Sequence, residues 1–356
     1  MDNQTTNQSP KVLKETKNKI TVDFERTSRR ERLRLKYLNI TFVGTLIWRI
    51  FRFLLLIGVS YVILYPFFSK ITASFMSAED FVDVTVKLIP KYPTLDTYAA
   101  IITDLKYFEA LKNTFLVSLA SALIQTFICC LIGYGFAKFK FPGSKILFAL
   151  VLFTMIVPHS TIQLALFMKF KYFDIYGIMN LLGGGVFPGL DIIKGNLTYI
   201  DLSNSLAPLV ILSLGGLAFK NGLYIFMMRQ FFRGVPDELE ESAYIDGSGV
   251  FRTFFRIVLP LSVPMMITVF LFAFSWQWTD QFYTSLFYSK NKMLMLPHLV
   301  GQVPRSLDIS DSAASGIYEA AVQNTIGLMI IAPLLIVYLF CQRYLVEGIE
   351  RSGIVG

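Results

Sequence analysis

Six long apolar runs constrain the fold of this chain more than any other feature of its sequence. They lie near 51–69, 114–136, 146–167, 206–228, 264–286 and 324–342. A helix of about 20 predominantly apolar residues crosses the hydrocarbon core of a bilayer, and it satisfies its own backbone polar groups there. The sequence therefore predicts an all-α polytopic membrane protein with six transmembrane helices.

Composition favours a membrane protein over a soluble one. Hydrophobic residues make up 54% of the chain and charged residues only 16%, against about a quarter charged in soluble domains. A net charge of +8 could indicate nucleic-acid binding, but residues 1–50 hold eleven Lys and Arg against five Asp and Glu, a surplus of six. Because the positive charge is local to this segment, we expect no nucleic-acid partner.

Basic residues in short flanks predict the orientation. They gather before the first run, between the second and third, and between the fourth and fifth: 28–36, Lys138, Lys140, Lys145, Arg229, Arg233, Arg252 and Arg256. Because cytoplasmic loops carry the positive excess, we expect both termini in the cytoplasm. The expected organisation is a basic cytoplasmic segment at 1–50, a first helix at 51–69, an extracellular segment at 70–113, a five-helix core at 114–343 and a cytoplasmic tail at 344–356. Within the core we expect a cytoplasmic loop at 229–263 and an extracellular insertion at 168–205.

Three smaller features of the runs lead to further expectations. Pro158 interrupts the third run, and since neighbouring helices can satisfy the freed carbonyl, we expect a kinked helix. The Gly-rich stretch 183–195 suggests no role. The Cys and His residues lack the spacing of a disulfide framework or a metal site, so we expect neither: Cys129, Cys130, Cys341, His159 and His298.

The cytoplasmic segment PDELEESAYIDGSGVFRTFFRIVLP at 236–260 differs from the runs around it. Pro236 suits the first turn of a helix, and the acids after it lie where the helix dipole favours negative charge: Asp237, Glu238, Glu240 and Glu241. Gly247 stands where a left-handed cap would end that helix. A second helix is predicted over 250–259, ending before Pro260. Composition alone leaves two interpretations open, an interfacial helix that joins two spans and a docking surface of small residues framed by acids.

Within this segment lies a spaced motif. Its members are Glu241, Ser242, Ala243, then Gly247 after three residues, Ile257 after nine more, and Leu259 and Pro260 after one. The pattern resembles the cytoplasmic signature of binding-protein-dependent ABC importer permeases, in which Ala stands where this chain has Ser242. The chain also resembles the MalG-like carbohydrate permeases of that superfamily in PTLDTYAAI at 93–101, FAKFKFPGSK at 136–145 and the ending LVEGIERSGIVG.

The resemblance implies a function and a set of partners. This chain would have the type I ABC importer permease fold and form half of a transmembrane pathway for a mono- or oligosaccharide in a bacterial cell membrane. A second permease chain, two cytoplasmic ATPase subunits and an extracellular solute-binding protein would assemble with it. The sequence has no Gly-x-x-x-x-Gly-Lys-Ser/Thr phosphate loop, so we expect a transport subunit that is not itself an enzyme, with ATP used by partner subunits and no cofactor bound here.

The resemblance also implies roles for the motif residues. As a coupling helix seated in a cleft of an ATPase, the segment would use Glu241 for a charged contact. Ala243 and Gly247 would permit close approach, and Asp246 would cap the helix or make a second polar contact.

Substrate contacts are predicted in less detail. Trp276, Trp278 and Asp280 combine aromatic rings with a polar group, a mixture that suits sugars, and an intramembrane acid is a functional candidate. The competing interpretation is an aromatic belt at the outer interface, with Asp280 near water. The same two interpretations apply to Lys220 in the fourth run.

Other functions stay open as alternatives. A permease for a non-sugar solute would carry the same motif. A stand-alone secondary transporter predicts paired broken helices in two related halves, and a membrane enzyme predicts converging catalytic groups. The sequence displays neither pattern.

Overall fold

The computed structural model describes residues 12–15, 21–24, 40–174, 199–288, 293–307 and 315–351, and its described side chains lie between 44 and 346. The chain divides into two compact units, Met1–Ser69 and Lys70–Gly356. The 183–195 insertion and residues 352–356 of the predicted tail lie outside the described residues.

The first unit holds a short hairpin and most of a long helix. Strand β1, Val12–Glu15, pairs antiparallel with β2, Thr21–Phe24, in a segment where the sequence predicted no strand. A two-stranded ribbon by itself is at best marginally stable. Helix α2, Ile40–Ala73, begins eleven residues before the predicted start at 51. Further apolar residues precede the predicted run, and these let the helix extend.

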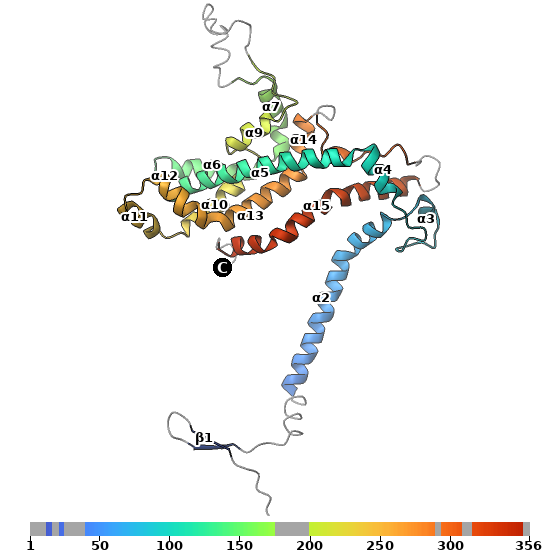
Figure 1. Ribbon diagram of the computed structural model, residues 1–356, viewed down its shortest axis with the longest axis horizontal. Coiled ribbons are helices and arrows are strands. Elements are labelled where there is room, and N and C mark those ends of the chain that lie inside the picture. The colour runs from blue at the N-terminus through green and yellow to red at the C-terminus, as the bar shows by residue number, and fades with distance from the viewer. Residues whose placement is uncertain are drawn as a thin grey trace, which may run out of the picture. The chain divides into compact units, whose positions relative to one another are not determined.

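The second unit is a helical bundle built around one long helix (Figure 1). Helix α5, Tyr107–Lys138, packs against α10, Asn221–Arg233, and α13, Leu259–Trp278. On the other side of α13 lies α15, Ser315–Arg351. The helices α5 and α10 approach closely, because a Cβ on Gly133 would lie 2.6 Å from Cβ of Met228. Small residues at such crossings are typical of membrane helices.

Shorter elements lie between the long helices. The helices α3 (Ala78–Val82) and α4 (Asp96–Asp104) lie in the predicted extracellular segment 70–113. The predicted fifth run is interrupted after Trp278, and its last residues form a separate helix, α14 (Phe282–Phe287), which packs against α7 and is followed by the 3-10 helix η2 (Leu296–Leu299). Asp104 links the end of α4 to the segment after η2, since its Oδ2 accepts a hydrogen bond from the backbone N–H of Ser306 at 2.7 Å. That bond lowers the pKa of Asp104.

The third predicted run forms two helices with a sharp bend between them. Helix α6, Ser144–Ile156, and α7, His159–Lys171, meet at 106°. The prediction of an irregularity at Pro158 is confirmed, although the bend is larger than a kink. Pro158 pushes the preceding Val157 out of the helical region to ψ 120°, as expected for a residue before proline.

The fourth predicted run is not one helix, and this expectation was wrong. Helix α9, Ala207–Leu214, ends at a glycine pair, and α10 begins only at Asn221. Gly216 has φ +68°, and a Cβ there would lie 2.7 Å from Ile132 Cδ1. Lys220 also takes the left-handed conformation, with φ +66°. The helix is interrupted where glycine permits a left-handed turn, while hydropathy is the same in a broken and an unbroken span.

The predicted stop at Pro260 was also wrong. Helix α12, Val250–Thr253, the π-helical turn η1, Phe254–Val258, and α13 follow one another without a gap. The N–H of Leu259 donates to the carbonyl of Phe254, five residues back. The wider π turn relieves the clash that a proline ring makes with the preceding turn of an α-helix, so the helix continues through Pro260 and ends at Trp278.

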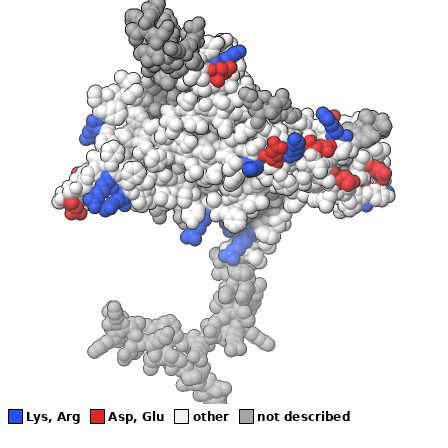
Figure 2. Space-filling view, turned by 45° about the horizontal axis from the view of Figure 1, so that its top comes forward, with Lys and Arg blue, Asp and Glu red and all other residues white. Residues whose placement is uncertain are grey.

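Among the described residues, four helices are long and apolar enough to cross a membrane, or five if the bent α6–α7 pair counts as one span. They include α2, α5, the continuous stretch Val250–Trp278 and α15. A broad part of the visible surface carries no charged side chain (Figure 2). The fold is therefore that of a polytopic helical membrane protein.

Candidate functional site

The predicted glycine corner closes a short helix, α11, Glu238–Ile245. Gly247 has φ +79°. The N–H of Ser248 donates to the carbonyl of Ala243 at 2.9 Å, and the N–H of Gly247 donates to the carbonyl of Tyr244 at 3.0 Å. This pair of bonds is the Schellman arrangement, in which a left-handed residue ends a helix. The predicted left-handed cap at Gly247 is confirmed.

A buried polar cluster ties α11 to the end of α5. Glu240 is 7% exposed, and its Oε2 accepts a hydrogen bond from the Tyr134 hydroxyl at 2.8 Å. The Lys138 ammonium donates to the carbonyl of Val235 at 2.7 Å and to Asp237 Oδ1, and it lies 3.6 Å from Glu240 Oε1. Lys138 thereby lowers the pKa of Asp237, first by hydrogen bonding and then by its charge. These contacts with Tyr134 and Lys138 of α5 therefore fix the orientation of α11.

Sequence reasoning missed this cluster because it treated the acids as one group that complements the helix dipole. The available signal was spacing: Asp237, Glu240 and Tyr244 recur at three and four residues, so they share one face of the helix. Glu240 Oε2 lies 3.5 Å from the Tyr244 hydroxyl. Glu241, one residue on, is exposed.

The face of α11 and of the turn after it that points away from α5 is exposed. Ile245 is 86% exposed and Phe251 is 81% exposed. No heavy atom lies within 4 Å of the position that a Gly247 Cβ would occupy. Among the motif residues, Glu241, Ser242, Asp246, Gly247 and Pro260 are exposed, Ile257 and Leu259 are half-buried, and Ala243 is buried. The exposed surface therefore contains both apolar side chains and acids. Ala243, which was expected to permit close approach of a partner, is instead buried within this chain.

The three residues predicted for a substrate pathway do not form one site. Trp278 is buried, and its Nε1–H donates to the carbonyl of Ile330 at 2.9 Å. The Asp280 carboxylate accepts the backbone N–H groups of Tyr283 and Thr284 at 3.3 and 3.0 Å, at the start of α14. Both groups are thus used within the fold. Trp276 is 45% exposed, and its ring lies 5.4 Å from that of Phe219, centroid to centroid.

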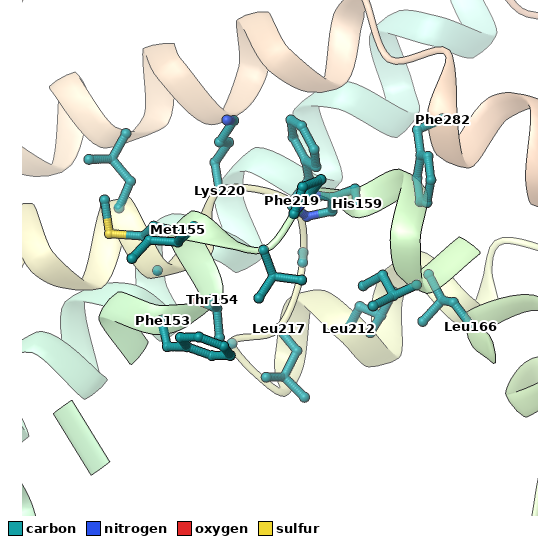
Figure 3. Close-up of a pocket in the computed structure, with 18 residues that line it drawn as sticks. Phe153, Thr154, Met155, His159, Leu166, Leu212, Leu217, Phe219, Lys220 and Phe282 are labelled. Atoms are coloured by element: carbon teal, nitrogen blue, oxygen red, sulfur yellow. The ribbon is translucent and has the colours of Figure 1, made fainter. Parts of the chain in front are cut away.

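A cavity of about 770 Å³ lies where α6 bends into α7 and where the chain enters α10 (Figure 3). Its lining includes Thr154, His159, Phe219, Lys220 and Phe282. The His159 ring lies 4.1 Å from that of Phe219, centroid to centroid, and 5.9 Å from that of Phe282. The Trp276 ring lies 5.4 Å from that of Phe219. Two helix breaks, of which the sequence predicted one, create this space.

Comparisons with known proteins agree with the fold. The curated relatives include the polygalacturonan/rhamnogalacturonan transport system permease protein YtcP of Bacillus subtilis (strain 168), 28% identical over 314 residues, which cover 86% of this chain and 97% of the relative. The galactooligosaccharides transport system permease protein GanQ of the same organism is 26% identical over 310 residues, covering 86% and 95%.

A solved structure extends the agreement to three dimensions. The crystal structure of a bacterial ABC transporter involved in the import of the acidic polysaccharide alginate contains a chain that matches this one with a TM-score of 0.60 and 19% identity, covering 90% of this chain and 99% of that one. The family described as "Binding-protein-dependent transport system inner membrane component" matches residues 130–351, which include α11 and its glycine corner. The chain therefore belongs to the family of binding-protein-dependent transport system inner membrane components.

Proposed function

We propose that this chain is the permease subunit of an ATP-binding-cassette importer and forms half of the transmembrane pathway for a carbohydrate. The observation that carries the proposal is the exposed left-handed turn at Gly247, which lies within the spaced motif. The helix before this turn, α11, is bonded to α5 through Glu240 and Tyr134. The names of the relatives YtcP and GanQ support a saccharide as the transported solute.

The chain crosses a bacterial cell membrane six times, with both termini in the cytoplasm. The spans are α2, α5, the bent pair α6–α7, the broken pair α9–α10, the continuous helix from α12 through α13, and α15. Supporting this orientation, Lys138 and Arg233 lie at the end of the bundle that carries α11, as the positive-inside rule requires.

The partners follow from the chemistry of the loop and from the family. Two cytoplasmic ATPase subunits use ATP, and one of them receives the exposed face around Ile245 and Phe251. A second permease chain completes the pathway, and an extracellular solute-binding protein delivers the saccharide. Closure of the ATPase pair moves α11, and the Glu240 cluster transmits that movement to α5, on which the bundle is built. The membrane helices then rock between inward- and outward-facing states.

Replacement of Gly247 tests the docking role. In cells that express the full importer, Gly247→Trp should leave the protein in the membrane and abolish saccharide uptake, because the indole would occupy the space of the docked ATPase. Gly247→Ala is the matched control. In this variant too, a residue with a Cβ atom takes the left-handed conformation, which costs about 1–2 kcal/mol. The alanine adds only one methyl group, at a position with no neighbour within 4 Å.

The two variants separate bulk from backbone strain. The Ala variant should keep most of the uptake, while the Trp variant loses it. Normal uptake by the Trp variant would refute docking at this corner. Equal loss in both variants would assign the effect to the backbone conformation instead, and failure of the wild type on every carbohydrate would defeat the saccharide assignment.

A further inference from the structure

Lys220 is a cation with no acidic partner in the described part of the chain. Its ammonium lies 4.8 Å from the ring centroid of Trp276 and 4.9 Å from that of Phe219. The ion pairs found among the described residues belong to Lys91 and Lys138. The faces of two aromatic rings therefore supply the stabilisation of this charge that the chain itself provides.

This charge lies far from the end of the bundle that carries α11. Lys220 directly precedes α10, whose thirteen residues run from Asn221 to Arg233 near that end. At 1.5 Å per helical residue, the length of α10 puts Lys220 about 20 Å from the end that carries α11. The hydrocarbon core is about 30 Å thick, so the ammonium lies within it in the proposed orientation. An ionisable group at such depth is costly, and it marks substrate pathways in membrane proteins.

The cavity beside Lys220 has a size and lining that suit a small saccharide. Its volume of about 770 Å³ falls in the range of small-molecule sites, about 300–1,000 Å³. Lys220, Phe219 and His159 all line it. Trp276, whose ring contacts both Phe219 and Lys220, is 45% exposed. Aromatic rings offer apolar faces on which the C–H face of a pyranose can pack, and the ammonium offers three hydrogen-bond donors.

We propose that Lys220, Phe219 and Trp276, with His159 beside them, bind a saccharide that bears a carboxylate, such as a uronate. The inference rests on the proposed import function and names the substrate class that this cluster selects. A neutral sugar would desolvate the ammonium without supplying a counter-charge, and that is unfavourable. A uronate carboxylate supplies the missing charge in a charge-assisted hydrogen bond.

The test compares one saccharide with and without its charge. Cells that express the full importer are given the galacturonate trisaccharide, which carries three carboxylates, or its trimethyl ester, which has the same skeleton and no carboxylate. Lys220→Met should lower uptake of the acid about ten- to hundredfold, as expected for the loss of one hydrogen bond between charged groups. Uptake of the ester should change by less than about twofold on the same reasoning, and Lys220→Arg should retain most uptake of the acid.

Lys171→Met is the matched control. Its ammonium also lies over two rings, 5.7 Å from Phe167 and 5.8 Å from Tyr172, but it does not line the cavity. It should change uptake of neither saccharide. Selection by the solute-binding protein is the same in every variant, so the ratio of variant to wild type isolates the permease.

Three results would overturn the inference. Equal losses of acid and ester in Lys220→Met would make Lys220 a structural residue. Unchanged uptake of the acid in that variant would remove it from the pathway. A wild type that imports neutral trisaccharides but no oligosaccharide of galacturonate, glucuronate or mannuronate would contradict the substrate class and leave the import function standing. A wild type that imports no saccharide at all would overturn both.

Discussion

Removing the buried carboxylate of Glu240 should loosen α11 from the bundle. In Glu240→Ala the Tyr134 hydroxyl loses its acceptor at 2.8 Å. Lys138 keeps Asp237 and the Val235 carbonyl, so no cation is left without a partner. The loss is then close to that of one hydrogen bond to a charged group, about 1.5–3 kcal/mol, and below the 3–5 kcal/mol of a broken buried ion pair.

Thermal and denaturant unfolding of the purified complex in detergent measures this loss. Glu241→Ala is the matched control, because Glu241 is the next residue, carries the same charge and is exposed. It should change the free energy of unfolding by less than about 0.5 kcal/mol and still reduce uptake through the ATPase contact.

A double-mutant cycle tests whether the side chains of Tyr134 and Glu240 interact. Tyr134→Phe and Glu240→Ala remove the same bond, so the double variant should cost about 1–2 kcal/mol less than the sum of the two single variants. Additive losses would mean that the two side chains do not interact. If Glu241→Ala lowered the free energy of unfolding as much as Glu240→Ala does, the negative charge of the acids near the start of α11, and not the buried contact of Glu240, would stabilise the helix.

Two further predictions concern packing and pH. Gly133→Ala should destabilise the bundle by about 1–3 kcal/mol, because its Cβ would lie 2.6 Å from Met228 Cβ and 3.0 Å from a backbone nitrogen. Gly135→Ala, two residues along and with no neighbour within 4 Å, should instead be neutral or stabilise the helix by up to about 1 kcal/mol, and equal unfolding midpoints would contradict this difference. Since the pKa of Asp104 is lowered in the folded chain, its contribution to stability should be complete above 3.8, the ordinary pKa of aspartate, and should be lost as the pH falls below that value. Hydrogen exchange at Ser306 should follow this pH dependence in the wild type, and an identical profile in Asp104→Asn would exclude the carboxylate as its cause.

Hydropathy alone located the membrane helices but not their breaks. Each predicted run contains helix in the structure, since apolar content determines what can enter a bilayer. The fourth run breaks at Gly215 and Gly216, and its hydropathy would be the same in a continuous helix. The break includes the left-handed backbone of Gly216 and its close approach to Ile132, a contact between residues far apart in sequence.

In the candidate site too, the local backbone feature was predicted from the sequence and the contacts between helices were not. The position of Gly247 after the predicted helix at 237–246 predicted the cap there, because a left-handed helix end is a local property. The role of Glu240 was not predicted, since only the packing of α11 on α5 distinguishes it from the acids beside it. Trp276 and Trp278 were grouped although residues two apart on a helix do not face each other. One is buried, and the other lies against Lys220.

In the proposed importer, the corner at Gly247 contacts an ATPase on the cytoplasmic side. A photo-crosslinking residue at Ile245, which is 86% exposed, tests it in the assembled importer, with the same residue at Val84, 89% exposed in the predicted extracellular segment, as the control. The predicted result is an adduct with the ATPase from position 245 and none from position 84. An adduct with the ATPase from position 84, or none from position 245 in a complex that still imports its saccharide, would contradict the docking role.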